Sequence, residues 1–334
     1  MPRLRKVSPY MPGWTRRRTG KGFSYLDTDG NRLPASDVER IRSLAIPPAW
    51  EDVWICPLAN GHLQAVGTDA AGRRQYLYHP DWRAKRDQAK FERVTTAAVR
   101  LAQARRQVHR DLSDPGMPRS RAAATAVRLL DLGYFRIGND AYTEDNGSFG
   151  LTTLERKHVR LQGNRLVFRF IGKSGVEHTV EIDDADAIAA INRMRKRRTA
   201  SARLLAYQQG KRWSDLDATA VNEYLGELLG GEMTAKDFRT WHATVLAALA
   251  LATTDEPGDT KASRKRAVKA AVEEVASYLG NTPTMAKNSY IDPRILDHYE
   301  SGATIMVDPN RFRSPERRQA AVEKAVLALL DGQG

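Results

Sequence analysis

The stretch YLGNTPTMAKNSY (278–290) brings two residues that could do chemistry close together along the chain. A helical pattern ends at Leu279, a turn carries Asn281 and Pro283, and a short polar stretch leads to Tyr290. A tyrosine can act as a nucleophile, and an asparagine can donate a hydrogen bond to the group that the tyrosine attacks. The alternative is a helix cap followed by a packed aromatic ring. These residues alone do not decide between the two.

The stretch EMTAKDFRTWHATVLAALALA (232–252) contains two cations at a predicted helix start. Thr234-x-x-Asp237 forms a capping box, so Lys236 and Arg239 lie in or beside the first turn. Exposed N–H groups and a guanidinium fork both suit phosphate oxygens. The apolar residues at helical spacing are expected in the core, and Trp241 and His242 are given no chemical role. The predicted core stripe is Phe238, Trp241, Val245 and Leu249.

Lys173 stands in RLVFRFIGKSGVEHTVEI (165–182), whose alternation and central glycines predict a β-hairpin. A nucleotide phosphate loop is excluded, because the pattern requires glycine where the chain has Val167 and because this turn joins two strands. Two interpretations remain. Lys173 is an ordinary turn lysine, or it is a cation that reaches into a groove and gives up a proton.

Two further stretches contribute candidates. LLDLGYFRIGNDAYTEDNGSFGLTTL (129–154) ends a helix at Gly133 and then presents Arg136 and Tyr142, which on their own resemble ordinary surface residues. GRRQYLYH (72–79) alternates basic, amide and aromatic side chains that could contact base edges, and strand periodicity predicts that one of its tyrosines is core. The candidates in this strand are Arg73, Gln75, Tyr76 and Tyr78.

The composition favours a polyanionic partner. The chain of 334 residues has a formal net charge of +13, which points to nucleic acid before an anionic membrane or an acidic protein. Cys56 is the only cysteine and the seven histidines are scattered, so neither a disulfide framework nor a metal site is expected. No signal-peptide pattern is present, and the longest apolar run, about 243–252, is too short for a bilayer span. We therefore expect a cytoplasmic location.

The elements that must position these residues divide into two domains. Residues 1–88 predict a β-rich domain, with an Asp-Gly hairpin in GFSYLDTDGNRL (22–33) and further strands in 53–79. Between them, Ser36-x-x-Glu39 predicts a capping box for a short helix. The pattern then becomes helical, beginning with one long helix over 87–112, so the boundary is expected within 84–90.

Residues 89–334 predict a mainly α-helical domain with one β-hairpin, which makes the whole chain α+β. The basic run RMRKRR (193–198) fits equally well as a solvated helix face or as part of a positive surface. The remaining helices are predicted at about 185–209, 217–229, 235–252, 261–279 and 315–330.

FRIGNDAY, FIGKSG, KDFRTW and LGNTPTMAKNSY follow one another in an order that resembles the type IB DNA topoisomerases, in particular their compact bacterial and poxvirus-like members. GRRQYLYH is similar to the DNA-contacting strand of that family's small N-terminal domain, so the resemblance covers nearly the whole chain. It implies a monomeric enzyme of the nucleoid that acts on double-stranded DNA. It implies no cofactor, metal, nucleotide or membrane.

The resemblance also implies a reaction. Tyr290 attacks a phosphodiester to form a 3′-phosphotyrosyl link and a free 5′-hydroxyl, the nicked duplex rotates, and the 5′-hydroxyl reseals it. Carried over position by position, the catalytic set is Arg136, Lys173, Arg239, Asn281 and Tyr290. The implied DNA contacts are Arg73, Gln75, Tyr76, Tyr78, Tyr142 and Lys236.

In this resemblance the two arginines stabilise the phosphorane, and Lys173 protonates the leaving 5′-oxygen with help from Arg136. In the poxvirus and eukaryotic enzymes of this family, the position of Asn281 is usually histidine. Asparagine can donate a hydrogen bond to a phosphate oxygen but cannot carry a charge, so Asn281 is expected to act as a neutral donor.

Two alternatives share some of these features. Tyrosine recombinases have the same nucleophile, but typically His-x-x-Arg where this chain has Lys236-x-x-Arg239. A non-catalytic DNA-binding protein would share the charge and the helices, but would have no use for a nucleophile at Tyr290.

Overall fold

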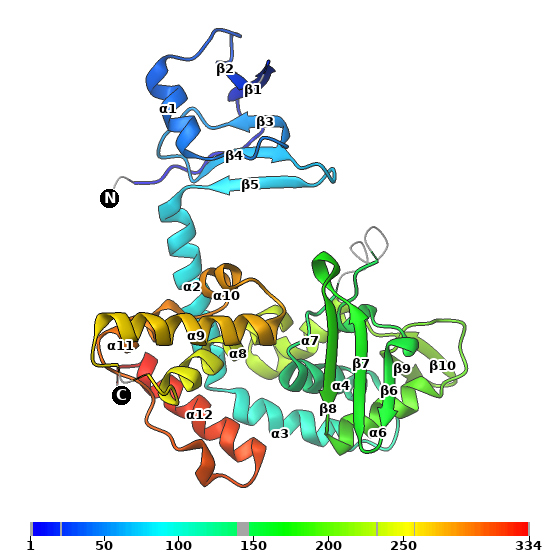
Figure 1. The fold of residues 1–334 in the computed structure, drawn as a ribbon. Coiled ribbons are helices and arrows are strands. Elements are labelled where there is room, and N and C mark those ends of the chain that lie inside the picture. Colours follow the sequence, from blue (N-terminus) through cyan, green and yellow to red (C-terminus); the bar gives the residue numbers. More distant parts are fainter. Residues whose placement is uncertain (1–2, 21, 139–146, 232, 257, 333–334) are drawn as a thin grey trace. The chain divides into compact units, whose positions relative to one another are not determined.

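The computed structural model describes residues 3–20, 22–138, 147–231, 233–256 and 258–332 (Figure 1). The chain divides into two compact units, Met1–Lys90 and Phe91–Gly334, and helix α2 (Pro80–Ala98) runs across the boundary. Within the described part of the chain, no helix combines the length and apolar character that a bilayer span requires.

The first unit is a five-stranded antiparallel sheet in the order β2-β1-β3-β4-β5, with one helix, α1 (Ala35–Ser43). Ile41 of α1 packs with Val53, Ile55 and Ala65 from the sheet in a small core of its own. β5 is an edge strand, which leaves one side of its backbone unpaired. The strands are β1 (Trp14–Thr19), β2 (Gly22–Leu26), β3 (Glu51–Ile55), β4 (Leu63–Thr68) and β5 (Arg74–Tyr78).

One local prediction for this unit is confirmed only in part, and another is wrong. The Asp-Gly turn closes a minimal hairpin, with an antiparallel bridge between Leu26 and Arg32 and a backbone bond from Leu33 N to the Tyr25 carbonyl, but the residues after the turn form no strand. Helix α1 begins one residue before Ser36, with Pro34 as its N-cap and no side-chain capping bond. Proline has no side-chain acceptor and no backbone N–H, so Pro34 can form neither hydrogen bond of a capping box.

The second unit is mainly helical, with a three-stranded antiparallel sheet in the order β6-β7-β8 and a two-stranded hairpin of β9 and β10. Figure 1 shows β6, β7 and β8 side by side. The strands are β6 (Val159–Gln162), β7 (Arg165–Ile171), β8 (Glu177–Ile182), β9 (Ala206–Gln209) and β10 (Arg212–Asp215). The short 3₁₀ turns are η1 (Leu151–Thr153), η2 (Arg156–His158), η3 (Lys173–Gly175) and η4 (Pro309–Arg311).

Helix α4 lies at the centre of this unit. Its sequence is rich in alanine, which favours helix and lets neighbouring elements approach closely on several sides. It contacts α3, α6, α7, α8, β8 and β9, and it ends at Gly133. The helices of the unit are α2, α3 (Leu101–Leu112), α4 (Arg119–Gly133), α6 (Ala185–Arg195), α7 (Ala218–Leu229), α8 (Ala235–Ala252), α9 (Lys261–Leu279), α10 (Pro283–Ser289), α11 (Pro293–Glu300) and α12 (Pro315–Leu330).

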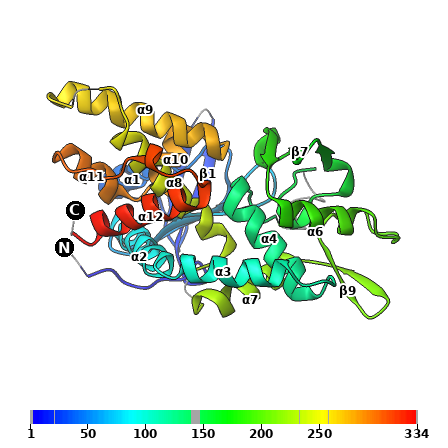
Figure 2. The ribbon, with the colours of Figure 1, turned by 90° about the horizontal axis from the view of Figure 1, so that it is seen from below.

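Helix α8 is the second central element, and α12, near the C-terminus, packs against it (Figure 2). The helix begins at Ala235 with Thr234 as its N-cap, and the Asp237 carboxylate accepts the Thr234 N–H at 3.0 Å. The predicted core stripe of α8 is confirmed for Phe238, Trp241 and Val245, which are buried, while Leu249 is partly buried and packs against the same core.

The structure corrects other predictions for the second unit. The long helix over 87–112 is two helices, α2 and α3, with a break at Val99 and Arg100 that no proline or glycine marks. The helix predicted over 185–209 ends at Arg195, and the hairpin of β9 and β10 follows. Arg197 in the basic run is not solvated, because its guanidinium donates to the carbonyls of Met194 and Leu204, each at 2.8 Å.

Candidate active site

Tyr290 is delivered by a short helix where the sequence predicted an irregular polar stretch. Helix α10 starts with Thr282, whose hydroxyl accepts the Met285 N–H at 3.2 Å, and Pro283 occupies its first turn. Tyr290 caps its C-terminal end and is half-buried. Its carbonyl accepts a hydrogen bond from the Thr244 hydroxyl of α8 at 3.4 Å. The tyrosine is therefore held on an ordered helix end.

Arg239 of α8 lies beneath this tyrosine and is only 3% exposed. Its Nη2 donates to the Leu279 carbonyl at 2.6 Å, and its Nη1 donates to the Tyr134 carbonyl. These carbonyls stand at the ends of α9 and α4, where backbone acceptors lack helical partners. The guanidinium carbon lies 5.4 Å from the centre of the Tyr290 ring. Arg239 thus joins two helix ends and faces the predicted nucleophile.

Arg136 follows α4 and joins the turn that carries Asn281. Its Nη2 donates to Asn281 Oδ1 at 2.6 Å and to the Gly280 carbonyl at 3.3 Å. Because a guanidinium can only donate, this contact fixes the orientation of the Asn281 amide. Asn281 Nδ2 is buried and has no hydrogen-bond partner among the described residues. The arrangement leaves a donor unsatisfied next to Arg136.

The pKa of Tyr290 reflects two opposing effects. Burial raises the pKa of this phenol. The nearby cations Arg239, Arg136 and Lys236 lower the pKa by more than burial raises it, so the net pKa lies below its ordinary value of 10.0. The same environment lowers the pKa of Arg239 to about 10, because burial and the neighbouring Arg136 disfavour a second charge. The site therefore makes Tyr290 easier to ionise than an ordinary tyrosine, and it has a concentrated positive field.

Lys173 lies on the turn between β7 and β8, as the hairpin pattern predicted. The turn forms a short 3₁₀ segment in which Ser174 takes a left-handed conformation, with φ at 66°. The Lys173 side chain is exposed. The position is that of a cation at the tip of a hairpin.

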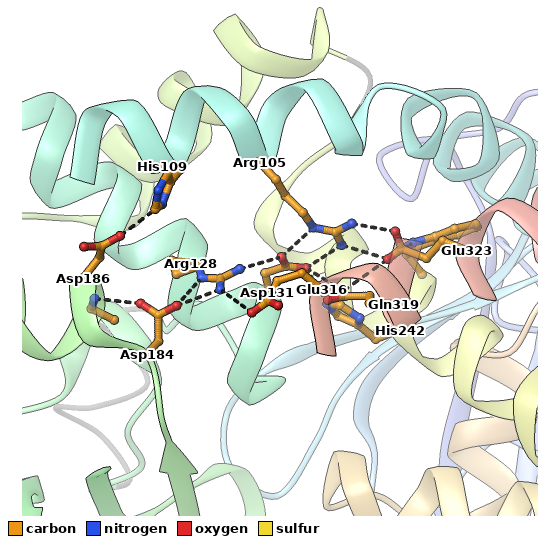
Figure 3. A network of polar contacts seen from close by, with 12 residues as sticks. Arg105, His109, Arg128, Asp131, Asp184, Asp186, His242, Glu316, Gln319 and Glu323 are labelled. Atoms are coloured by element: carbon orange, nitrogen blue, oxygen red, sulfur yellow. Dashed lines mark hydrogen bonds and ion pairs between the residues drawn. The ribbon is translucent and has the colours of Figure 1, made fainter. Parts of the chain in front are cut away.

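A buried ion cluster, which no sequence pattern indicated, joins α3, α4, α8 and α12 (Figure 3). Arg105 of α3 donates to Asp131 of α4 at 2.7 and 2.8 Å and to Glu323 of α12 at 2.6 and 2.8 Å. Trp241 of α8 donates to Glu323 at 3.1 Å, and His242 Nε2 lies 3.5 Å from Asp131. A pairing signal was absent from the sequence because the partners come from different helices.

The predicted DNA contacts of the second unit are only partly described. Lys236 is exposed in the first turn of α8, close enough to lower the pKa of Tyr290. Tyr142 lies outside the described residues. Among the described residues, no group of three or more His, Cys, Asp or Glu side chains could hold a metal ion.

The predicted contacts on β5 separate into two groups. Tyr76 and Tyr78 are 46% and 45% exposed and stack with ring centroids 6.3 Å apart. The prediction that one of them is core is wrong, because residues two apart on a strand share a face and Leu77 faces the core instead. Arg74, which was not among the predicted contacts, shares the exposed face with both tyrosines.

Arg73 and Gln75 instead contact Asp69. The Arg73 guanidinium lies 2.8 Å from the Asp69 carboxylate, and Gln75 Nε2 donates to the same carboxylate at 2.9 Å. These contacts lower the pKa of Asp69 to about 2, with the Arg73 hydrogen bond as the largest cause. Gln75 is half-buried and, by strand alternation, points away from the face of the two tyrosines.

Comparison with known proteins places the chain in a family. Residues 79–305 match the family described as eukaryotic DNA topoisomerase I, catalytic core, and residues 22–69 match bacterial DNA topoisomerase IB, N-terminal domain. DNA topoisomerase 1B of Acanthamoeba polyphaga mimivirus is 28% identical over 309 residues, which cover 89% of this chain and 90% of the relative.

DNA topoisomerase 1B of Vaccinia virus (strain Copenhagen) is 24% identical over 287 residues, or 81% of this chain and 86% of the relative. DNA topoisomerase 1 beta of Arabidopsis thaliana is 25% identical over 264 residues, which are 72% of this chain and 27% of that longer protein. These matches favour a topoisomerase over a recombinase or a non-catalytic DNA-binding protein. With the first family match spanning most of its length, the chain belongs to the type IB DNA topoisomerases.

Proposed function

We propose that this topoisomerase relaxes supercoiled duplex DNA through attack of Tyr290 on a backbone phosphodiester. The phenolic oxygen forms a bond to phosphorus while the bond from phosphorus to the 5′-oxygen breaks. The product is a 3′-phosphotyrosyl link and a 5′-hydroxyl. After rotation of the nicked duplex, the 5′-hydroxyl attacks the phosphotyrosine and restores both partners. The covalent link conserves the energy of the broken bond, so the cycle consumes no ATP.

The position of Tyr290 over Arg239 is the observation that carries this proposal. A half-buried phenol normally resists ionisation, yet the surrounding cations lower the pKa of this one. A lowered pKa increases the fraction of phenolate, which is the attacking form. The same cations would stabilise the negative charge that grows on the phosphorane oxygens in the transition state.

In this proposal the remaining residues have separate tasks. Arg136 and Arg239 bind the non-bridging oxygens, and the unsatisfied Asn281 Nδ2 donates a third hydrogen bond to them. Lys173, at the tip of the hairpin, gives its proton to the departing 5′-oxygen. Lys236 adds a phosphate contact at the start of α8.

The first unit is proposed to clamp DNA through β5. Tyr76 and Tyr78 offer flat exposed faces, while Arg73, Gln75 and Tyr142 remain candidate contacts by family resemblance. One site and one clamp suffice for a single nick, so we propose that the enzyme works as a monomer on nucleoid DNA.

Trapping the covalent adduct tests the proposed nucleophile. The protein is incubated with supercoiled plasmid without ATP or magnesium, and a denaturant then captures any protein linked to DNA. We expect Tyr290→Phe to abolish both the adduct and relaxation. Tyr278→Phe is the matched control, because Tyr278 is 56% exposed at the end of α9 and has no proposed chemical role. An adduct that persists in Tyr290→Phe would refute the assignment.

A further inference from the structure

We propose that His178 is a positioning residue that holds the Lys173 turn against the Asn281 turn. This inference rests on the proposed role of Lys173 as the acid that protonates the 5′-oxygen. His178 is the second residue of β8 and is half-buried. No role for it followed from the sequence, although its alternation with Val180 and Ile182 places it on the inner face of the strand.

The imidazole ring fits between two glycines that directly precede functional residues. A Cβ atom on Gly172, next to Lys173, would lie 2.6 Å from His178 Cδ2 and Nε2. A Cβ atom on Gly280, next to Asn281, would lie 2.5 Å from His178 Cε1. Both distances are shorter than real contacts permit, so the ring occupies the space that side chains at these positions would need. His178 thereby bridges the backbone of the two turns.

The ring is also supported from the interior of the unit. It stacks on Phe170 with a centroid distance of 5.2 Å and an interplanar angle of 20°. Phe170 stacks in turn on Phe135 at 5.9 Å, and Phe135 is the neighbour of Arg136 along the chain. This aromatic row connects the bridge to the segment that carries the first arginine, so a displaced ring would affect both sides of the site.

His178 acts through shape and not through charge. Burial lowers the pKa of this imidazole, and the nearby guanidinium groups of Arg136 and Arg239 lower it further. The ring is therefore neutral at pH 7, since its pKa lies below the ordinary value of 6.5. A neutral ring adds no further repulsion to a site that already holds two guanidinium groups.

The residues of the Lys173 turn from 173 to 177 are all exposed. Backbone bonds from Gly172 N to the Val176 carbonyl at 2.7 Å and from Gly175 N to the Gly172 carbonyl at 3.2 Å close the turn on itself. They do not connect it with the turn that carries Asn281. An acid displaced by about 1 Å can lose about a hundredfold in rate, so the bridge through His178 has a direct effect on leaving-group protonation.

A sulfur leaving group provides the test. Single-turnover cleavage is measured on a duplex with a mapped cleavage site, and on the same duplex with sulfur in place of the bridging 5′-oxygen. A thiolate departs without a proton because its pKa, about 8.5 for a free thiol, is far below that of an alcohol. We expect His178→Ala to slow cleavage of the oxygen substrate by about tenfold to a hundredfold. The rate on the sulfur substrate should stay near that of the unchanged protein.

The Lys173→Ala variant separates the possible failures. If sulfur does not restore cleavage by Lys173→Ala, the proposed acid is wrong. Suppose that the sulfur substrate restores the cleavage rate of Lys173→Ala, while His178→Ala cleaves both substrates slowly or both at the normal rate. Lys173 then remains the acid, and only the inference about His178 is overturned.

Gly172→Ala gives a second test that leaves His178 in place. Gly172 has φ at −94° and ψ at −166°, an extended conformation that alanine adopts without strain, so the added methyl acts only by displacing the ring. We expect this variant to show the same sulfur-dependent recovery. The double variant with His178→Ala should be no slower than His178→Ala alone, because the methyl then enters empty space. Multiplied losses in the double variant would contradict the bridge.

Discussion

Asn281 is the residue whose chemistry the structure defines most sharply. Its oxygen accepts from Arg136, and its buried Nδ2 lacks a partner among the described residues. An unsatisfied buried donor costs about 1–3 kcal/mol, and a phosphate oxygen at this position would offset that cost only once substrate is bound. In the proposed mechanism, this amide would bind the transition-state oxyanion as a neutral donor.

Substitutions at Asn281 should separate the effect of its hydrogen-bond donor from the effect of a charge at this position. We expect Asn281→Ala to lower the single-turnover cleavage rate by about 10²–10³, the usual effect of losing one oxyanion donor. Asn281→His should retain most of the activity, since one ring nitrogen can accept from Arg136 while the other donates. Asn281→Asp keeps the size and the acceptor but replaces the donor with a negative charge, so it should be at least as slow as the alanine variant. Cleavage by Asn281→Ala at the unchanged rate would eliminate this role.

The structure brings candidate residues from distant parts of the sequence together, as Arg136 with Asn281 and Arg239 with Tyr290, but their burial was not predictable. Tyr290 and Lys173 lie where a helix end and a hairpin turn put them. Arg239 was expected at an exposed helix start and is instead almost fully buried, because it joins the ends of α4 and α9. Long-range contacts of this kind leave no local pattern, and the bridge through His178 was missed for the same reason.

At the scale of elements, the ion cluster on Arg105 links α3, α4, α8 and α12. Helix α4 precedes Arg136, and α8 carries Arg239. Burial raises the pKa of the Asp131 carboxyl, but Arg105 outweighs that effect and the net pKa is lowered. The Asp131 carboxylate therefore stays charged and paired with Arg105 inside the folded protein.

Removal of Arg105 should destabilise the whole second unit. Arg105→Ala leaves two buried carboxylates without their shared partner, which costs about 3–5 kcal/mol. Denaturant unfolding measures this loss, and Arg106→Ala, at the exposed neighbouring position, should change stability by less than about 0.5 kcal/mol. Equal effects of the two variants would show that the cluster contributes little.

The pH dependence of this loss has a definite sign. A carboxyl whose folded pKa is lowered contributes stability that is fully present above its unfolded pKa of about 3.9. That contribution disappears as the pH falls through the lower folded pKa. The difference in stability between the unchanged protein and Arg105→Ala should therefore narrow below about pH 4.

Longer elements were predicted better than short ones. Helices α7, α8, α9 and α12 and the hairpin of β7 and β8 carry long periodic patterns and form within a residue or so of their predicted bounds. Helix α10 and the hairpin of β9 and β10 were missed because they are short and bury few side chains. Gly210, with φ at 60° between the two strands, was the available sign of that hairpin.

At the scale of the whole molecule, the net charge of +13 implies that DNA binding weakens as salt rises. Each cation that neutralises a phosphate contributes about 0.9 to the slope of log affinity against log salt. Aromatic side chains contribute by stacking and leave that slope unchanged. The exposed face of β5 contains both kinds of residue, which makes their contributions separable.

Binding of a plain duplex should distinguish the residues of this face. The measurements use the protein with Tyr290→Phe, so that no cleavage occurs, across a range of salt. We expect Arg74→Ala to weaken binding and to reduce the slope by about 0.9. Tyr76→Ala should weaken binding with the slope unchanged. Arg73→Ala is the matched control, because Arg73 already pairs with Asp69 and should alter the slope less than its neighbour does. If Arg73→Ala produced the larger change, phosphate contact would belong to the side of β5 that faces Asp69, and the assignment of the tyrosine face would be wrong.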